Sequence, residues 1–63
     1  MTSILAQNSE IVTVAELNAT FRLNGVKAQA EQDGLFVEVE VARNDDAGVA
    51  EFLAHKAGFE VLN

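Results

Sequence analysis

The stretch LNATFRLNGVKAQAEQDGLFVEVEVA, residues 17–42, decides the fold that we expect from this sequence. Apolar and polar residues alternate through it with a period of two, which is typical of strands that bury one face. Asn24-Gly25 and Asp33-Gly34 interrupt the alternation, and both pairs are favoured in tight hairpin turns because they tolerate a positive φ. The stretch therefore predicts a three-stranded antiparallel meander with strands at about 17–24, 26–32 and 35–42.

Two-residue turns at both sites would fix the register of this meander. The central strand would then place Ala28 opposite Val39 and Ala30 opposite Val37, with small alanines where a helix crosses the sheet. A slip by one residue would expose the whole apolar set to water. On the polar face the same register predicts a favourable cross-strand pair between Lys27 and Glu40.

A helix at about 46–57 is expected to cover the sheet. Asn44-Asp45-Asp46 supplies an N-cap and first-turn acids, and Gly58 follows as a C-terminal stop. Helical spacing predicts an inward stripe made of Val49, Phe52, Leu53 and Ala57. Residues 59–62 then read as a short strand at a sheet edge.

The first sixteen residues support two interpretations. Ile4 and Leu5 fit a further strand, and Glu10 to Val14 is rich in β-branched residues. Thr13-Val14-Ala15-Glu16, however, matches a capping box, which would begin a helix running through Leu17 and Phe21. We favour strands from Leu17 onward because the alternation and the Asn-Gly pair agree.

The composition indicates one small α+β domain spanning residues 1–63. The chain has ten acidic and four basic residues, a net charge of −6 and no cysteine. Acidity on this scale argues against binding to a phosphate backbone, which needs clustered Lys and Arg. No apolar run reaches the ~18 residues of a membrane span. We expect a cytoplasmic protein that contacts neither membrane nor nucleic acid directly.

No constellation of residues predicts catalysis, a metal or a cofactor. His55 has no Ser–Asp or cysteine partners in the pattern and sits four residues after Glu51, where a simple helical contact is expected. Glu38 and Glu40 share a strand face, but a flat solvated sheet offers no pocket that would shift a carboxyl pKa. Asp45-Asp46 lacks the alternating ligands of a calcium loop. We therefore expect a protein that is not an enzyme.

The polar face of the meander is the candidate site for a protein partner. Its acids cluster at the second hairpin, and an aromatic residue on the same face could anchor a contact inside a charged rim. A partner with a basic patch would complement this surface. The candidate partner-binding residues are Glu31, Asp33, Phe36, Glu38 and Glu40.

The second half of the chain resembles small phage host-takeover proteins. The residues that carry the likeness are Phe36-Val37-Glu38-Val39, then Ala42-Arg43-Asn44-Asp45-Asp46, then Ala57-Gly58-Phe59-Glu60-Val61. The family includes the short inhibitor that a podovirus coliphage directs at RNA polymerase. The resemblance implies a hairpin, an acidic helix cap, an amphipathic helix and a final strand, and it implies inhibition of a host enzyme by docking.

Two functions are thus expected from the sequence. The first is a non-enzymatic inhibitor that occludes a host nucleic-acid enzyme or defence complex through the acidic sheet face. The alternative is a homodimeric module that self-associates through an exposed strand edge or through the alanine side of the helix, formed by Ala47, Ala50 and Ala54.

Overall fold

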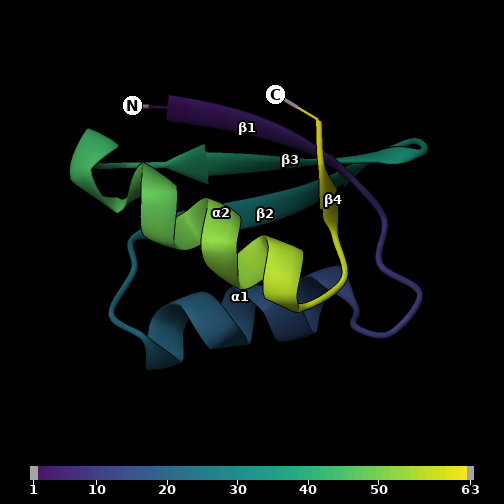
Figure 1. Cartoon of the computed structure of the whole chain (residues 1–63), viewed down its shortest axis with the longest axis horizontal. Coiled ribbons are helices and arrows are strands. Elements are labelled where there is room, and N and C mark those ends of the chain that lie inside the picture. Colours follow the sequence, from purple (N-terminus) through teal and green to yellow (C-terminus); the bar gives the residue numbers. More distant parts are fainter. Residues whose placement is uncertain (1, 63) are drawn as a thin grey trace.

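The structure is a computed structural model that describes residues 2–62 (Figure 1). Each helix follows a strand, two strands in succession separate the helices, and a short 3₁₀ turn, Asn44–Asp46, precedes the second helix. The elements are β1 (Thr2–Gln7), α1 (Val14–Leu23), β2 (Ala28–Asp33), β3 (Phe36–Val41), α2 (Ala47–Lys56) and β4 (Glu60–Val61).

The four strands form one sheet in the order β2-β3-β1-β4, and every neighbouring pair is antiparallel. This order, with a helix after β1 and another after β3, is the split β-α-β topology of ferredoxin-like folds. The predicted α+β class, the short C-terminal strand and the further N-terminal strand are confirmed. Three antiparallel strands do lie side by side as expected, but the third is β1 rather than residues 17–24.

The prediction of a strand at 17–24 was wrong, because these residues belong to α1 and its cap. Leu17 and Phe21, four residues apart, satisfy a helical period as well as a period of two, and both are fully buried. Leu23 distinguishes the two periods, since a strand would bury it and the structure leaves it 87% exposed. The competing interpretation, a helix begun by the capping box, is confirmed.

Hydrogen bonds at both ends of α1 explain why the helix forms. The Glu16 backbone N–H donates to the Thr13 hydroxyl at 3.1 Å, and the Thr13 N–H donates to the Glu16 carboxylate at 3.1 Å. At the other end Gly25 has φ 69°, and the Val26 N–H donates to the Phe21 carbonyl at 2.9 Å. This is a Schellman motif, so the Asn-Gly pair ends a helix instead of turning a hairpin.

The hairpin between β2 and β3 exists, but its register differs from the predicted one by two residues. Asp33 lies opposite Phe36, so the turn residues are Gly34 and Leu35, and Ala30 lies opposite Val39. Gly34 has φ 62° at the first turn position, as a type II′ turn requires. A shift of two residues preserves the face of every side chain, so the predicted inward and outward sets survive.

Helix α2 confirms the predicted helix and half of its inward stripe, since Leu53 and Ala57 pack against the core. Val49 and Phe52 were expected inside and are 47% and 57% exposed, whereas Ala50 and Ala54 are buried. These alanines are the fourth and eighth residues of α2, the positions that Leu17 and Phe21 hold in α1. Large residues from one helix and small residues from the other thus fill the space over one sheet.

Both helices cover the same face of the sheet, and the core lies between them and the strands (Figure 1). The inward residues of β3, Val37, Val39 and Val41, are the centre of this core, with Ile4 and Ala6 of β1 beside them. The opposite face of the sheet has no helix over it in residues 2–62. No helix within that range is long and apolar enough to span a bilayer.

The open face of the sheet as a candidate protein-binding site

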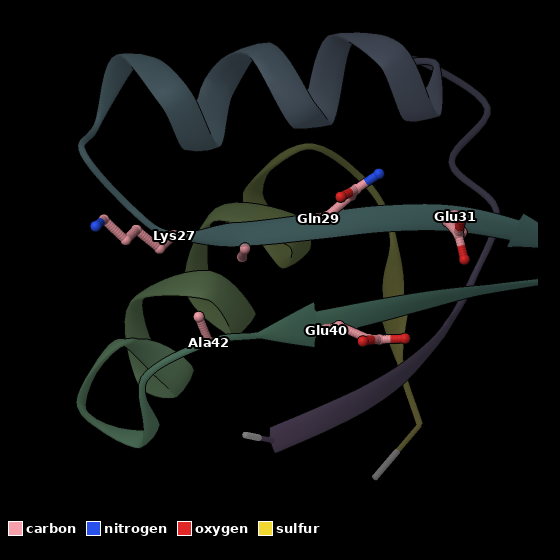
Figure 2. Close-up of a pocket in the computed structure, with 6 residues that line it drawn as sticks. Lys27, Gln29, Glu31, Glu40 and Ala42 are labelled. Carbon is pink, nitrogen blue, oxygen red and sulfur yellow. The ribbon is translucent and has the colours of Figure 1, made fainter.

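We call the sheet surface opposite the two helices the open face. Alternation along each strand places one set of side chains there, and the strands lie in front of α2 when viewed from this side (Figure 2). The open face consists of Ser3, Leu5, Gln7, Gln29, Glu31, Asp33, Phe36, Glu38, Glu40, Glu60 and Leu62. All five residues predicted to bind a partner therefore share one surface.

Negative charge concentrates over β2 and β3. Glu31 lies directly opposite Glu38, and Glu40 is two residues further along the same face of β3. Like charges in directly opposed positions destabilise a sheet. Within residues 2–62 the ion pair that forms below 4 Å, Arg43 with Asp45 at 3.7 Å, lies outside this face. Within the described part of the chain, the carboxylates over β2 and β3 therefore form no ion pair.

Lys27 does not form the cross-strand pair predicted with Glu40. In the observed register Glu40 lies opposite Gln29, and the Lys27 carbonyl accepts from the Ala42 N–H at 2.9 Å. Figure 2 shows the Lys27 side chain, which lies just before the start of β2, extending away from Glu40. A shallow open hollow of about 460 Å³ lies between them, lined by Lys27, Ala28, Gln29, Glu31, Glu40 and Ala42.

We call Leu5, Phe36 and Leu62 the apolar patch. It adjoins the acidic cluster, which consists of Glu31, Glu38 and Glu40. Their side chains are 38%, 39% and 44% exposed. Leu62 lies beside Leu5, since the Leu62 N–H donates to the Leu5 carbonyl at 2.8 Å. Phe36 is on β3, two residues before Glu38, and Glu38 is the cross-strand partner of Leu5. The predicted exposed aromatic is therefore present. Its cross-strand partners are Gln7 and Asp33, and Leu5 is its diagonal neighbour on β1.

Sequence reasoning missed Leu5 and Leu62 because it left the pairing partner of the N-terminal strand open. Alternation within Ser3-Ile4-Leu5-Ala6 was the available signal, since Ile4 and Ala6 are buried and Leu5 is exposed. Only the pairing of β1 between β3 and β4 shows that Leu5 and Leu62 meet on the face that carries Phe36. The acidic residues of the open face could be predicted, because alternation along β2 and β3 alone decides which face their side chains occupy.

Parts of the surfaces that suggested self-association are used inside the molecule, while β2 and β4 remain the two edge strands of the sheet. Ala50 and Ala54 pack in the core, so the predicted alanine face of the helix is not free. At the β2 edge the Ala30 N–H donates to the Asn18 carboxamide oxygen at 2.7 Å, and the Asn18 amide donates back to the Ala30 carbonyl at 3.0 Å. β4 pairs along β1 at the other side of the sheet.

None of the titratable side chains in residues 2–62 is buried. No group of three or more His, Cys, Asp or Glu that could hold a metal occurs in residues 2–62. His55 is exposed on α2. Backbone and side-chain hydrogen bonds from Thr13 lower the pKa of Glu16, and they belong to the helix cap.

No protein-family model matches the chain, and comparisons with curated proteins and with solved structures found no match. The topology is shared by proteins of many unrelated functions, so it does not indicate one. The residues of the open face are therefore the feature of the chain that bears on its function.

Proposed function

We propose that this chain is a non-enzymatic protein-binding domain whose open face docks onto a basic surface of another protein. The observation that carries the proposal is the direct opposition of Glu31 and Glu38, with Glu40 beside them and the apolar patch adjoining. Such an arrangement weakens the free sheet. A partner with Lys and Arg at matching positions would relieve the repulsion and cover Phe36.

The activity that follows is inhibition by occlusion. A basic surface on a nucleic-acid enzyme or a defence complex is where that protein meets phosphates, so an acidic domain seated there would block it. This agrees with the likeness of the second half of the chain to small phage host-takeover inhibitors. In that setting the protein acts in the host cytoplasm, and its complementary charge speeds association.

The test is a comparison of two double variants with the same net charge. Glu38→Lys with Glu40→Lys reverses charge on the open face, whereas Glu10→Lys with Glu51→Lys reverses it on exposed positions elsewhere. The proposal expects the unaltered chain and the second variant to retain the same defined protein from lysate, and the first variant to lose it. Equal retention by both variants would exclude the open face as the binding surface.

A salt series with the captured partner gives an independent check. Electrostatic steering loses association rate as ionic strength rises, and dissociation changes less. An association rate that does not depend on salt would contradict docking through the carboxylates. The homodimer alternative would have to use the edge of β4 or the part of β2 beyond Ala30, because Ala50 and Ala54 are buried and Asn18 occupies the edge at Ala30.

A further inference from the structure

We propose that Asn24 is a site of spontaneous deamidation that the fold protects, so that the reaction proceeds only when the C-terminal turn of α1 opens. Of the asparagines in the sequence, Asn24 alone is followed by a glycine. Glycine leaves the backbone nitrogen that must react unshielded, because it carries no Cβ. Asn24 and Gly25 are both exposed, so water, which is the co-reactant, reaches them.

Deamidation at an Asn-Gly pair is an intramolecular substitution followed by hydrolysis. The backbone nitrogen of Gly25 attacks Cγ of Asn24 and forms a new C–N bond. The bond from Cγ to the amide nitrogen of Asn24 breaks, and that nitrogen leaves as ammonia with the proton of the Gly25 nitrogen. Water then opens the cyclic imide at either carbonyl and gives aspartate or isoaspartate. The net change replaces NH₂ by OH and needs no oxidant or reductant.

The backbone conformation at Asn24 keeps the two reacting atoms apart. Ring closure needs the Gly25 nitrogen to lie on the side of the Cα–C bond that carries Cβ of Asn24. With ψ 5°, the Gly25 nitrogen is instead nearly eclipsed with the backbone nitrogen of Asn24. A large rotation about ψ is therefore required. Because Gly25 with φ 69° completes the Schellman motif, that rotation takes the motif apart.

Hydrogen bonds hold both reacting groups in this arrangement. The Gly25 N–H donates to the Arg22 carbonyl at 3.1 Å, and this is the nitrogen that must attack. The Asn24 carboxamide donates to the Thr20 carbonyl at 2.8 Å, which holds Cγ against the last turn of the helix. Attack breaks both bonds. The rate in the folded chain is therefore the rate in an unrestrained peptide multiplied by the fraction of chains in which the turn is open.

The products of the reaction do not fit the turn that the asparagine makes. Aspartate at this position has no N–H to donate to the Thr20 carbonyl, and it places negative charge at the negative end of the helix dipole. Isoaspartate adds a carbon to the main chain, which displaces the Val26 N–H from the Phe21 carbonyl, to which it now donates at 2.9 Å. Deamidation therefore marks chains whose turn has opened and hinders re-formation of the cap.

Peptide mapping by mass spectrometry during incubation at neutral pH measures the reaction in the unaltered chain. Cleavage after Arg22 and Lys27 isolates residues 23–27, in which Asn24 is the one asparagine. A synthetic peptide of residues 20–28 in the same buffer gives the unrestrained rate. Hydrogen exchange at the Gly25 amide gives the fraction of chains in which its bond to the Arg22 carbonyl is broken.

We expect the folded chain to deamidate at least about tenfold more slowly than the peptide, as the loss of two hydrogen bonds predicts. The slowing should be no smaller than the protection of the Gly25 amide from exchange. Equal rates in chain and peptide, or a slowing smaller than that protection, would show that the reaction runs in the closed turn and would overturn the proposal. A peptide that does not deamidate would overturn the site itself.

Two asparagine-to-aspartate variants test the claim about the product. Asn24→Asp places the charge at the end of α1, whereas Asn44→Asp places it in the turn before α2, where negative charge is favourable. An aspartate at 44 also keeps an oxygen that accepts from the Thr2 hydroxyl. We expect Asn24→Asp to lower the Tm and Asn44→Asp to leave it unchanged or raise it. A Tm for Asn24→Asp equal to that of the unaltered chain would refute the claim that deamidation disables the cap.

Discussion

The carboxamide of Asn18 pairs with both backbone groups of Ala30, and so a side chain of α1 takes the place of a neighbouring strand at the β2 edge. The two hydrogen bonds measure 2.7 and 3.0 Å. They satisfy a buried backbone position that would otherwise lack partners within the sheet. They also tie the helix to the strand that follows it and close a site where another chain could add.

Asn18→Ala should therefore destabilise the protein by about 1–3 kcal/mol, because the Ala30 N–H and C=O lose their partners in a part-buried site. Urea unfolding measures the loss, and hydrogen exchange at the Ala30 amide locates it. Asn18→Asp keeps an acceptor for the Ala30 N–H but sets a carboxylate against the Ala30 carbonyl, so it should protect the amide without restoring full stability. An unchanged exchange rate at Ala30 in Asn18→Ala would contradict the pairing.

Gly58 and Gly48 should respond in opposite directions to alanine. Gly58 has φ 95°, and a Cβ there would meet the Ser9 hydroxyl oxygen at 2.7 Å, so Gly58→Ala should cost about 1–3 kcal/mol. Gly48 lies in α2 with nothing within 4 Å of an added Cβ, so Gly48→Ala should stabilise by about 0.5–1 kcal/mol. Thermal unfolding of the two variants checks both signs, and a stable Gly58→Ala protein would refute the contact with Ser9.

The capping box predicts a pH dependence with a defined sign. Hydrogen bonds from Thr13, the backbone one foremost, lower the pKa of Glu16 in the folded state. The stabilisation by this carboxylate is therefore present above its unfolded pKa, near ~4.3, and is lost as the pH falls through the folded value. The difference in unfolding free energy between the unaltered chain and Glu16→Gln should shrink below that pH. A difference that stays constant from neutral pH into acid would contradict the cap.

Glu38→Gln should make the free protein more stable. The substitution removes one of two directly opposed carboxylates and keeps the shape of the side chain. The gain should be about 0.2–1 kcal/mol, the range for a cross-strand pair, and should fall as salt screens the repulsion. Glu51→Gln on α2 is the matched control, with no opposed carboxylate across a strand. If Glu38→Gln were less stable than the control, the acidic cluster would not be a source of strain in the free sheet.

Much of the architecture was predictable because local signals and burial agreed. Alternation along β2 and β3 assigned each side chain to the correct face of the sheet, even though the predicted register was shifted by two residues. The prediction therefore placed five residues on one face: Glu31, Asp33, Phe36, Glu38 and Glu40. Gly58 was correctly read as the end of α2, where the Phe59 N–H donates to the Ala54 carbonyl at 3.0 Å. Both features depend on neighbours in sequence.

The errors came from patterns that fit two structures. Asn24-Gly25 offers a positive φ that serves a hairpin or a Schellman cap equally, and Leu17 with Phe21 fits either period. In α2 the largest apolar side chains were assigned to the core, yet Ala50 and Ala54 are buried there because Leu17 and Phe21 of α1 already fill much of the space. Tertiary packing decides which helix contributes the large core side chains, and the local sequence of one helix cannot predict it.

The most direct test of the central claim is carboxyl footprinting of the chain with its captured partner. A carbodiimide and an amine nucleophile label accessible carboxylates, and mass spectrometry reads each site with and without the partner. Docking through the open face predicts that Glu31, Glu38 and Glu40 lose reactivity in the complex, while Glu10 and Glu51 keep theirs. Protection of Glu51 or Glu10 with unchanged labelling of Glu31, Glu38 and Glu40 would contradict the account.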